Sequence, residues 1–275
     1  MPRPAAAFCL AIALTLSSAL VAQAPPVRWG MTAGVVSFNA IRSEQAVTTT
    51  LEYDPTSWLT LSMIPSGVRI AQSQTATAPA ASRTGIADLP VSAAASFTLP
   101  GSLSPNLGAG VTVGLPTASC GLGSSVTSVG LDAGAGIAPS DAFHLSVDAT
   151  RSLTSGVARS AFIPAQSTWV STDATVIPSE RWTATLSYGA AYGVPDSIAP
   201  RELGGGVSYN IRGPLALTLD ASHGLTHGSP RWVFSIGIGT AFSGTSPVTP
   251  TEPFRRLRTT FVAGKLVTTT TTPCQ

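Results

Sequence analysis

Short segments in which large apolar residues alternate with small or polar ones dominate this sequence. In Phe143–Thr150 one set of alternate positions reads Phe, Leu, Val, Ala, and the other reads His, Ser, Asp, Thr. Successive side chains of an extended strand point to opposite faces, so a period of two predicts β-strands rather than helices. Leu215–Ser222 and Val129–Ile137 repeat the pattern.

About twelve such segments of about ten residues follow one another, a length that suits a tilted membrane-spanning strand. Helical periodicity between them is nearly absent. The clearest segments are Leu107–Leu115, Val129–Ile137, Phe143–Thr150, Trp182–Tyr192, Leu203–Ile211, Leu215–Ser222 and Trp232–Phe242. Weaker ones are Arg28–Asn39, Ala46–Asp54, Trp58–Ala71, Ile86–Leu99 and Trp169–Ile177.

The connections between these segments alternate between short and long. Turn-forming residues occur at Asp54-Pro55, Pro100-Gly101, Pro139–Asp141, Pro178–Glu180 and Arg212–Pro214. Looser stretches lie near Arg42 and at 72–84, 118–125, 154–167, 194–200 and 223–230. Bacterial outer-membrane barrels have short periplasmic turns, longer outer loops and an even number of strands. The sequence therefore predicts an all-β fold, a transmembrane antiparallel β-barrel of about 12 strands with up-and-down topology.

The last strong segment shows what its two faces would contact. From Trp232 onward one face carries Phe234, Ile236 and Ile238, while the other is mostly Ser, Gly and Ala. The second face is too small for a packed core, which favours a lumen on that side and lipid on the other. We expect this segment to close the barrel against the first strand, near Trp29.

Large aromatic residues fall near the ends of the expected strands. Aromatic rings prefer the membrane–water interface, and Trp and Tyr add a polar group to an apolar body. With the amino end in the periplasm, one set lies at the periplasmic rim: Trp29, Tyr53, Trp58, Phe97, Phe143, Trp182, Tyr209 and Phe242. Trp169, Tyr192 and Trp232 lie at the outer rim.

Charged residues lie opposite the apolar faces. A carboxylate is costly in a dry core but not in a wet lumen. The residues predicted to face the lumen are Glu52, Asp88, Asp132, His144, Asp148, Glu202 and Asp220. Arg69 shares a face with Leu59 and Leu61, so it would join them only if a bulge near Pro65 shifted the alternation. A soluble sheet with this face in bulk water is the alternative.

The termini differ in character from the central part of the chain. Residues 1–24 have a basic start, an apolar run and Ala22-Gln23-Ala24, the pattern of a signal peptide for export. We expect the barrel over residues 25–243. A Pro- and Thr-rich tail over 244–275 is expected to be disordered and periplasmic, with a strand at Leu257–Val267 as the alternative. Cys120 and Cys274 would lie on opposite sides of the membrane and stay unpaired.

The segments also resemble a known family. "GIADLPVSAAASFTLP" and "LGAGVTVGLPTAS" resemble a stretch of the outer-membrane barrels named after the MetA pathway of phenol degradation. The matching residues are Gly85, Asp88, Leu115, Pro116 and Thr117, with Ala118 where Gly is usual. The end of the chain, from Leu203 to Phe242, is similar to that family's last three strands. The resemblance implies a barrel with a transport or channel role and no catalytic residues.

Sequence signals for catalysis or metal binding are weak. His223 and His227 are four residues apart but lie among Gly and Ser in an expected outer loop, which favours solvated side chains. His144, Ser146 and Asp148 line up along one strand rather than converge. We therefore predict no enzyme, no cofactor and no metal.

The amino-acid composition restricts which partners the protein can bind. Charged residues make up 10% of the chain, against about 25% in typical soluble domains. A net charge of +2 without a basic face excludes nucleic acid. The expected partners are outer-membrane lipids, the barrel-assembly machinery and an unidentified small solute, in the outer membrane of a diderm bacterium.

The preferred interpretation of function is a passive channel or transporter for small solutes, apolar or aromatic ones included. A barrel with a structural or surface-interaction role and a secreted soluble β-sandwich are the alternatives.

Overall fold

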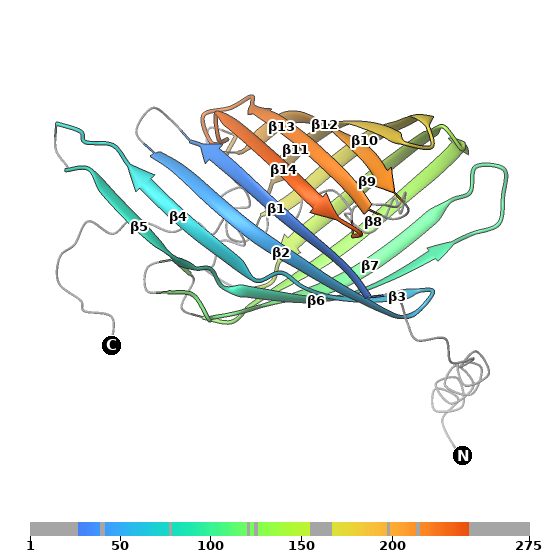
Figure 1. Cartoon of the computed structure of the whole chain (residues 1–275), viewed down its shortest axis with the longest axis horizontal. Coiled ribbons are helices and arrows are strands. Elements are labelled where there is room, and N and C mark those ends of the chain that lie inside the picture. The colour runs from blue at the N-terminus through green and yellow to red at the C-terminus, as the bar shows by residue number, and fades with distance from the viewer. Residues whose placement is uncertain are drawn as a thin grey trace, which may run out of the picture.

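The computed structural model describes residues 27–38, 42–76, 79–119, 122–123, 126–154, 167–196, 199–212 and 215–241. They form one antiparallel sheet that closes on itself as a barrel (Figure 1). The strands are β1 (Val27–Ser37), β2 (Arg42–Thr56), β3 (Leu59–Met63), β4 (Ser66–Gln72), β5 (Ala81–Ile86), β6 (Leu89–Thr98), β7 (Asn106–Leu115), β8 (Ser128–Ser140), β9 (Phe143–Ser152), β10 (Thr168–Ser179), β11 (Trp182–Tyr192), β12 (Arg201–Arg212), β13 (Leu215–Gly224) and β14 (Trp232–Gly239).

The fourteen strand segments make a barrel of 12 strands, because two walls are each broken in the middle. β3 and β4 are one wall interrupted at Ile64-Pro65, and β5 and β6 are another interrupted at Ala87-Asp88. Proline has no N–H to donate, which accounts for the first break. The prediction of an all-β, up-and-down barrel of about twelve strands is confirmed.

The barrel closes between β1 and β14, the pairing that the sequence predicts. Ala33 lies opposite Ile236 in that register, and β1 pairs with β2 on its other side. Beyond the paired residues, the Trp29 carbonyl accepts a hydrogen bond from the Ala241 N–H at 2.9 Å. Neither the first nor the last strand of the sheet is therefore left as a free edge.

The pairing of β1 with β14 predicts that cysteines at opposite positions form a disulfide cross-link. In a variant with Cys9, Cys120 and Cys274 replaced by Ser, we expect Ala33→Cys with Ile236→Cys to form a disulfide under mild oxidation. Directly opposite Cβ atoms lie about 5 Å apart, close enough to bridge after a small shift. The unfolded, cross-linked chain should migrate faster on a gel than the reduced chain. Ala33→Cys with Ile238→Cys is the matched control, and equal cross-linking of both pairs would contradict the register.

The two ends of the barrel differ. At the short-turn end only residues 57–58, 141–142 and 180–181 separate β2 from β3, β8 from β9 and β10 from β11. β1 begins and β14 ends at this end. The other end, where β1, β4 and β13 end, is called the long-loop end below. The β4–β5 hairpin extends beyond its neighbours there (Figure 1).

A loop completes the wall beside β5. β5 pairs only with β4, because β7 ends at Leu115 and does not reach it. The backbone of Ile86 bonds to Ser119 instead, with its N–H donating to Ser119 Oγ at 3.0 Å and its carbonyl accepting from the Ser119 N–H at 2.9 Å. The Ala118 N–H donates to Asp88 Oδ1 at 3.2 Å. The segment after β7 therefore bonds to the wall at Ile86 and Asp88.

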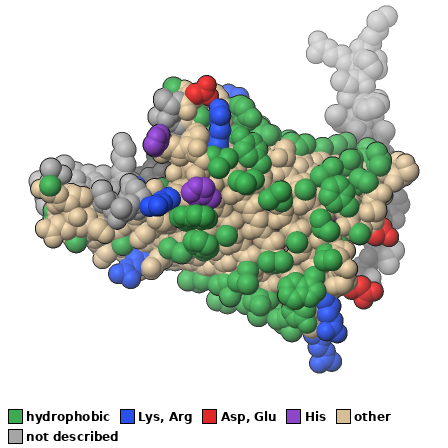
Figure 2. Space-filling model, turned by 90° about the horizontal axis from the view of Figure 1, so that it is seen from above, with side chains coloured by type: hydrophobic (Ala, Val, Ile, Leu, Met, Phe, Trp, Pro, Cys, Tyr) green, Lys and Arg blue, Asp and Glu red, His purple; other side chains and the backbone are tan. Residues whose placement is uncertain are grey.

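Large apolar side chains cover the outside of the barrel. Leu186, Val47 and Phe234 are 60%, 51% and 49% exposed, although each lies in the middle of a paired strand. Figure 2 shows hydrophobic side chains over the middle of one face and charged side chains toward its ends. An apolar band between polar ends is typical of a barrel in a bilayer.

Within the described part of the chain, no helix is long and apolar enough to cross a membrane. The predicted signal peptide, the predicted tail, Phe242, Cys120 and Cys274 lie outside the described residues.

Candidate pore

Alternation of exposed and buried side chains separates outward from inward positions along each strand. Every residue predicted for the lumen occupies an inward position: Glu52, Asp88, Asp132, His144, Asp148, Glu202 and Asp220. The structure adds further inward charged residues: Arg28, Arg42, Glu44, Asp54, Arg83 and Asp173. Carboxylates therefore outnumber arginines on the inward wall of the described strands.

Hydroxyl groups from neighbouring strands hold many of these carboxylates. Asp132 on β8 accepts hydrogen bonds from Thr112 on β7 at 3.1 Å and Thr150 on β9 at 2.7 Å. Glu202 on β12 accepts one from Ser222 on β13 at 2.9 Å. Hydroxyl donors form charge-assisted hydrogen bonds to these carboxylates. Because inward carboxylates outnumber arginines on the described strands, we expect a negative potential in the lumen.

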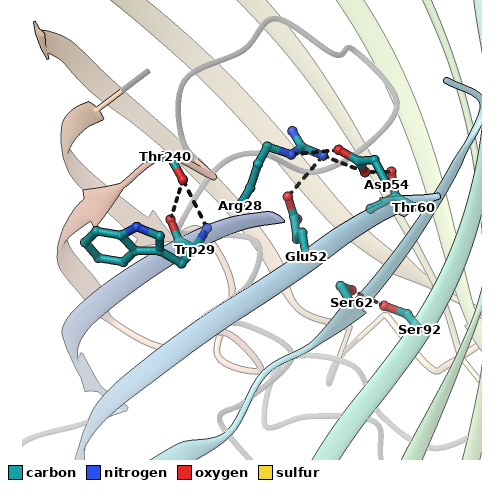
Figure 3. A network of polar contacts seen from close by, with 8 residues as sticks. All are labelled: Arg28, Trp29, Glu52, Asp54, Thr60, Ser62, Ser92 and Thr240. Carbon is teal, nitrogen blue, oxygen red and sulfur yellow. Dashed lines mark hydrogen bonds and ion pairs between the residues drawn. The ribbon is translucent and has the colours of Figure 1, made fainter. Parts of the chain in front are cut away.

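An ion network lies near the short-turn end, on β1, β2 and β3 (Figure 3). Arg28 contacts Glu52 at 3.2 Å and Asp54 at 3.0 Å. Thr60 donates a further hydrogen bond to Asp54 at 2.7 Å. The Glu52 side chain is only 5% exposed, so the Arg28 guanidinium compensates a carboxylate that water reaches poorly.

A second ion pair lies at the opposite end of β2. The Arg42 guanidinium contacts the buried carboxylate of Glu44 and lies 5.0 Å from the centroid of the Phe38 ring. Both Arg28 and Arg42 therefore contact acidic residues of β2.

An apolar cluster fills part of the lumen toward the long-loop end. Its members come from distant parts of the wall: Val36, Ala46, Val68, Ile70, Ala87, Leu122, Trp169, Ala191 and Val233. Strands β4 and β10 lie far apart around the barrel, so side chains from both can share one cluster only across the interior. Leu122, from the loop after β7, is 1% exposed. The interior toward the long-loop end therefore combines this apolar cluster with buried carboxylates, since Glu44 pairs with Val36 and Ile70, and Glu202 pairs with Gly189 beside Trp169.

Trp169 does not lie in the outer aromatic rim, where the sequence predicts it. It is 5% exposed and lies inside the barrel, in the apolar cluster. A Cβ added to Gly189 on β11 would lie 2.2 Å from the Trp169 ring, so the missing side chain of Gly189 provides the space. The alternation already indicates this orientation, because Trp169 shares a face with Ser171 and Asp173.

The other predicted interface aromatics lie near the strand ends. Those with strongly exposed side chains are Trp29, Tyr53, Phe97, Trp182, Tyr192 and Trp232. Trp58, Phe143 and Tyr209 are half-buried. Trp58 stacks on Phe97 with centroids 6.0 Å apart, and Trp182 packs on Tyr209 at 4.8 Å. Trp232 contacts His223 at 4.3 Å at the long-loop end.

Sequence reasoning missed several of the interior residues. Glu44 and Asp54 share the face of Glu52, so the alternation of β2 could have found them. Leu122 gave no signal, because it lies in a Gly- and Ser-rich loop without periodicity. Arg69 stays outward as its alternation indicates, since the break at Pro65 does not shift the faces.

Histidine and carboxylate side chains are the candidate metal ligands among the described residues. These residues contain no group of three His, Cys, Asp or Glu side chains that could hold a metal ion. His223 Nδ1 lies 2.7 Å from the Arg231 carbonyl oxygen, while His227 is exposed.

The Arg28 network predicts a stability effect. Arg28→Ala leaves the Glu52 carboxylate without its cation, so we expect the free energy of unfolding to fall by about 1–3 kcal/mol. Urea unfolding in lipid vesicles, followed by tryptophan fluorescence, measures it. The control is Arg201→Ala: its pair with Asp196 has side chains 44% and 91% exposed and should contribute less than about 1 kcal/mol. Equal losses in the two variants would contradict a compensating role for Arg28.

Comparison with known proteins identifies the class of fold. No protein-family model and no curated protein matches the chain. Among solved structures, the COG4313 outer membrane channel from Pseudomonas putida F1 is similar, with a TM-score of 0.62 and 13% identity over 81% of this chain and 97% of that chain. The KdgM porin has a TM-score of 0.51 and 6% identity, covering 76% and 97% of the two chains. The NanC porin has a TM-score of 0.51 and 8% identity, covering 76% and 98%.

At such identities the likeness shows the fold alone, a closed barrel of the kind found in outer-membrane channels and porins. The chain thus shares its architecture with channels rather than with a soluble sandwich. The more specific resemblance to the MetA-pathway family stays a prediction, because no family model matches.

Proposed function

We propose that this protein is a passive channel of a bacterial outer membrane, with the short turns in the periplasm, that admits small solutes. The observation that carries the proposal is the interior of the closed barrel. Its inward wall is built largely from Gly, Ser, Thr and carboxylates rather than from the large apolar residues of a sealed core. The neighbours with the same fold carry channel or porin names, which supports the proposal.

The apolar cluster favours small solutes with an apolar part. A solute that passes this cluster meets the apolar side chains of Leu122, Trp169 and Ile70, which give few hydrogen bonds to the hydroxyl groups of a sugar. An aromatic or aliphatic solute makes favourable contacts there. We therefore infer that apolar and aromatic solutes enter more readily than sugars of the same size.

The test is uptake by liposomes that contain the purified, refolded protein. We expect benzyl alcohol derivatives with a membrane-impermeant charged group to enter faster than a sugar of similar mass. A heat-dependent gel shift shows that the barrel is folded in each preparation. Uptake equal to that of protein-free liposomes, from a folded barrel, would contradict the channel function and favour the structural alternative.

A further inference from the structure

A groove runs along the outside of the barrel, separate from the lumen. It has a volume of about 1170 Å³ and extends from β5 across β4, β2, β1 and β14 to β13 and beyond. Val47, Phe234 and Ile236 contribute large apolar side chains to it. In a membrane this surface contacts lipid, so a groove here has the position and the chemistry to hold acyl chains.

Small residues make the floor of the groove. Ala33, Gly67 and Ala221 lie on outward positions of β1, β4 and β13, and each leaves a gap between larger neighbours. A Cβ added to Gly67 would meet no atom within 4 Å. The space above Gly67 is therefore open, and a larger side chain at this position would project into the groove without displacing the backbone.

One end of the groove is polar. Gln45 on β2 lies directly opposite Arg69 on β4, and Arg69 directly opposite Thr84 on β5, so the three share the outward face. All three are exposed and line the groove. Arg69 lies three residues before the end of β4 and Gln45 three residues after the start of β2, on the half of each wall toward the long-loop end. The structure records no hydrogen bond or ion pair between the Arg69 side chain and another described residue.

An outward arginine on a membrane barrel has to be explained. Lys or Arg on the lipid face costs about 2–4 kcal/mol at the middle of the bilayer and close to nothing at the interface. An anionic group at the interface would turn Arg69 into a favourable contact, because a guanidinium binds a phosphate through two parallel hydrogen bonds. The Gln45 amide and the Thr84 hydroxyl can add donors on either side.

We propose that this groove is a binding site for lipid A, the phosphorylated and acylated glycolipid of the outer leaflet, which rests on the proposed outer-membrane location. A phosphate group binds Arg69, Gln45 and Thr84, and acyl chains lie over Ala33, Gly67 and Ala221. Charge complementarity at one end and an apolar floor beside it match the two halves of such a lipid. The site is independent of solute passage through the lumen.

Native mass spectrometry of the full chain in detergent, titrated with lipid A, tests the proposal. We expect Arg69→Gln to weaken lipid A binding about tenfold or more, as for loss of a charged hydrogen-bonded contact, and Arg69→Lys to restore part of it. Gly67→Leu should also weaken binding, because it fills the groove and leaves Arg69 in place. Arg151→Gln is the matched control, since Arg151 is an exposed, outward arginine of β9 outside the groove.

Three results would overturn the site. An equal loss in Arg69→Gln and Arg151→Gln would mean general attraction to positive charge. Unchanged binding in Gly67→Leu would mean that the groove holds no acyl chain. Phosphatidylglycerol binding as tight as lipid A binding would mean a surface for any anionic lipid. A heat-dependent gel shift and unchanged channel conductance show that each variant is folded, and they separate failure of this site from failure of the channel function.

Discussion

With a tenfold gradient of potassium chloride across a planar bilayer, we expect the channel to carry potassium in preference to chloride by about sevenfold or more. A potential of −1 kT per unit charge in the lumen, at the low end of what charge-lined clefts reach, raises the cation concentration about 2.7-fold and lowers that of the anion equally. We expect the inward carboxylates of β8 to β13 to contribute to this potential: Asp132, Asp148, Asp173, Glu202 and Asp220.

Variants with uncharged side chains show whether the inward carboxylates cause the preference for potassium. Asp132→Asn, Asp148→Asn and Asp220→Asn combined keep the size of each side chain and its capacity to accept hydrogen bonds, so the barrel should fold normally. We expect the reversal potential to move toward that of an unselective pore. Asp196→Asn is the control, because Asp196 is 91% exposed and lies outside the strands. A wild-type channel that prefers chloride, or a triple variant with unchanged selectivity, would contradict the acidic lumen.

Leu122→Ala should give larger conductance steps than the wild type. Leu122 is 1% exposed and anchors the segment after β7 in the apolar cluster. Removal of a buried leucine side chain costs about 2–4 kcal/mol, so Leu122→Ala weakens the packing of this residue in the apolar cluster. The segment should therefore leave the constriction more often.

A second substitution distinguishes a specific effect of the apolar cluster on conductance from a general loss of barrel stability. Trp169→Ala enlarges the constriction from the opposite wall and should also increase the conductance. Leu225→Ala removes an equal volume from a side chain that is 52% exposed in the long-loop region, and it should leave conductance unchanged. Smaller or unchanged steps in both Leu122→Ala and Trp169→Ala would show that the apolar cluster does not limit the flow.

Much of the barrel could be predicted from the alternation of residues. Trp182–Tyr192 is both the predicted segment and the observed β11, and each of the other predicted segments corresponds to a wall of the barrel. The reason is physical: a strand with lipid on one side and a wet lumen on the other must alternate. The same alternation placed Asp132, Asp148 and Asp220 on the inward face.

Other features follow from contacts that a sequence does not reveal. Residues 72–84 were predicted as a loop, yet β5 begins at Ala81, because pairing with β4 compensates for a weakly alternating segment that contains Arg83. Trp169 was predicted for the interface from its position at a strand end, although it shares a face with the inward Ser171 and Asp173; what the sequence does not reveal is the space beside Gly189 that holds its ring. Insertion of Leu122 depends on tertiary packing alone, and no local pattern indicates it.

Conductance of the purified, refolded protein in a planar lipid bilayer tests the central claim most directly. A heat-dependent gel shift first establishes that the barrel is closed. We expect discrete, cation-preferring current steps that grow larger in Leu122→Ala. A folded barrel that gives no current steps in either the wild type or this variant would contradict it.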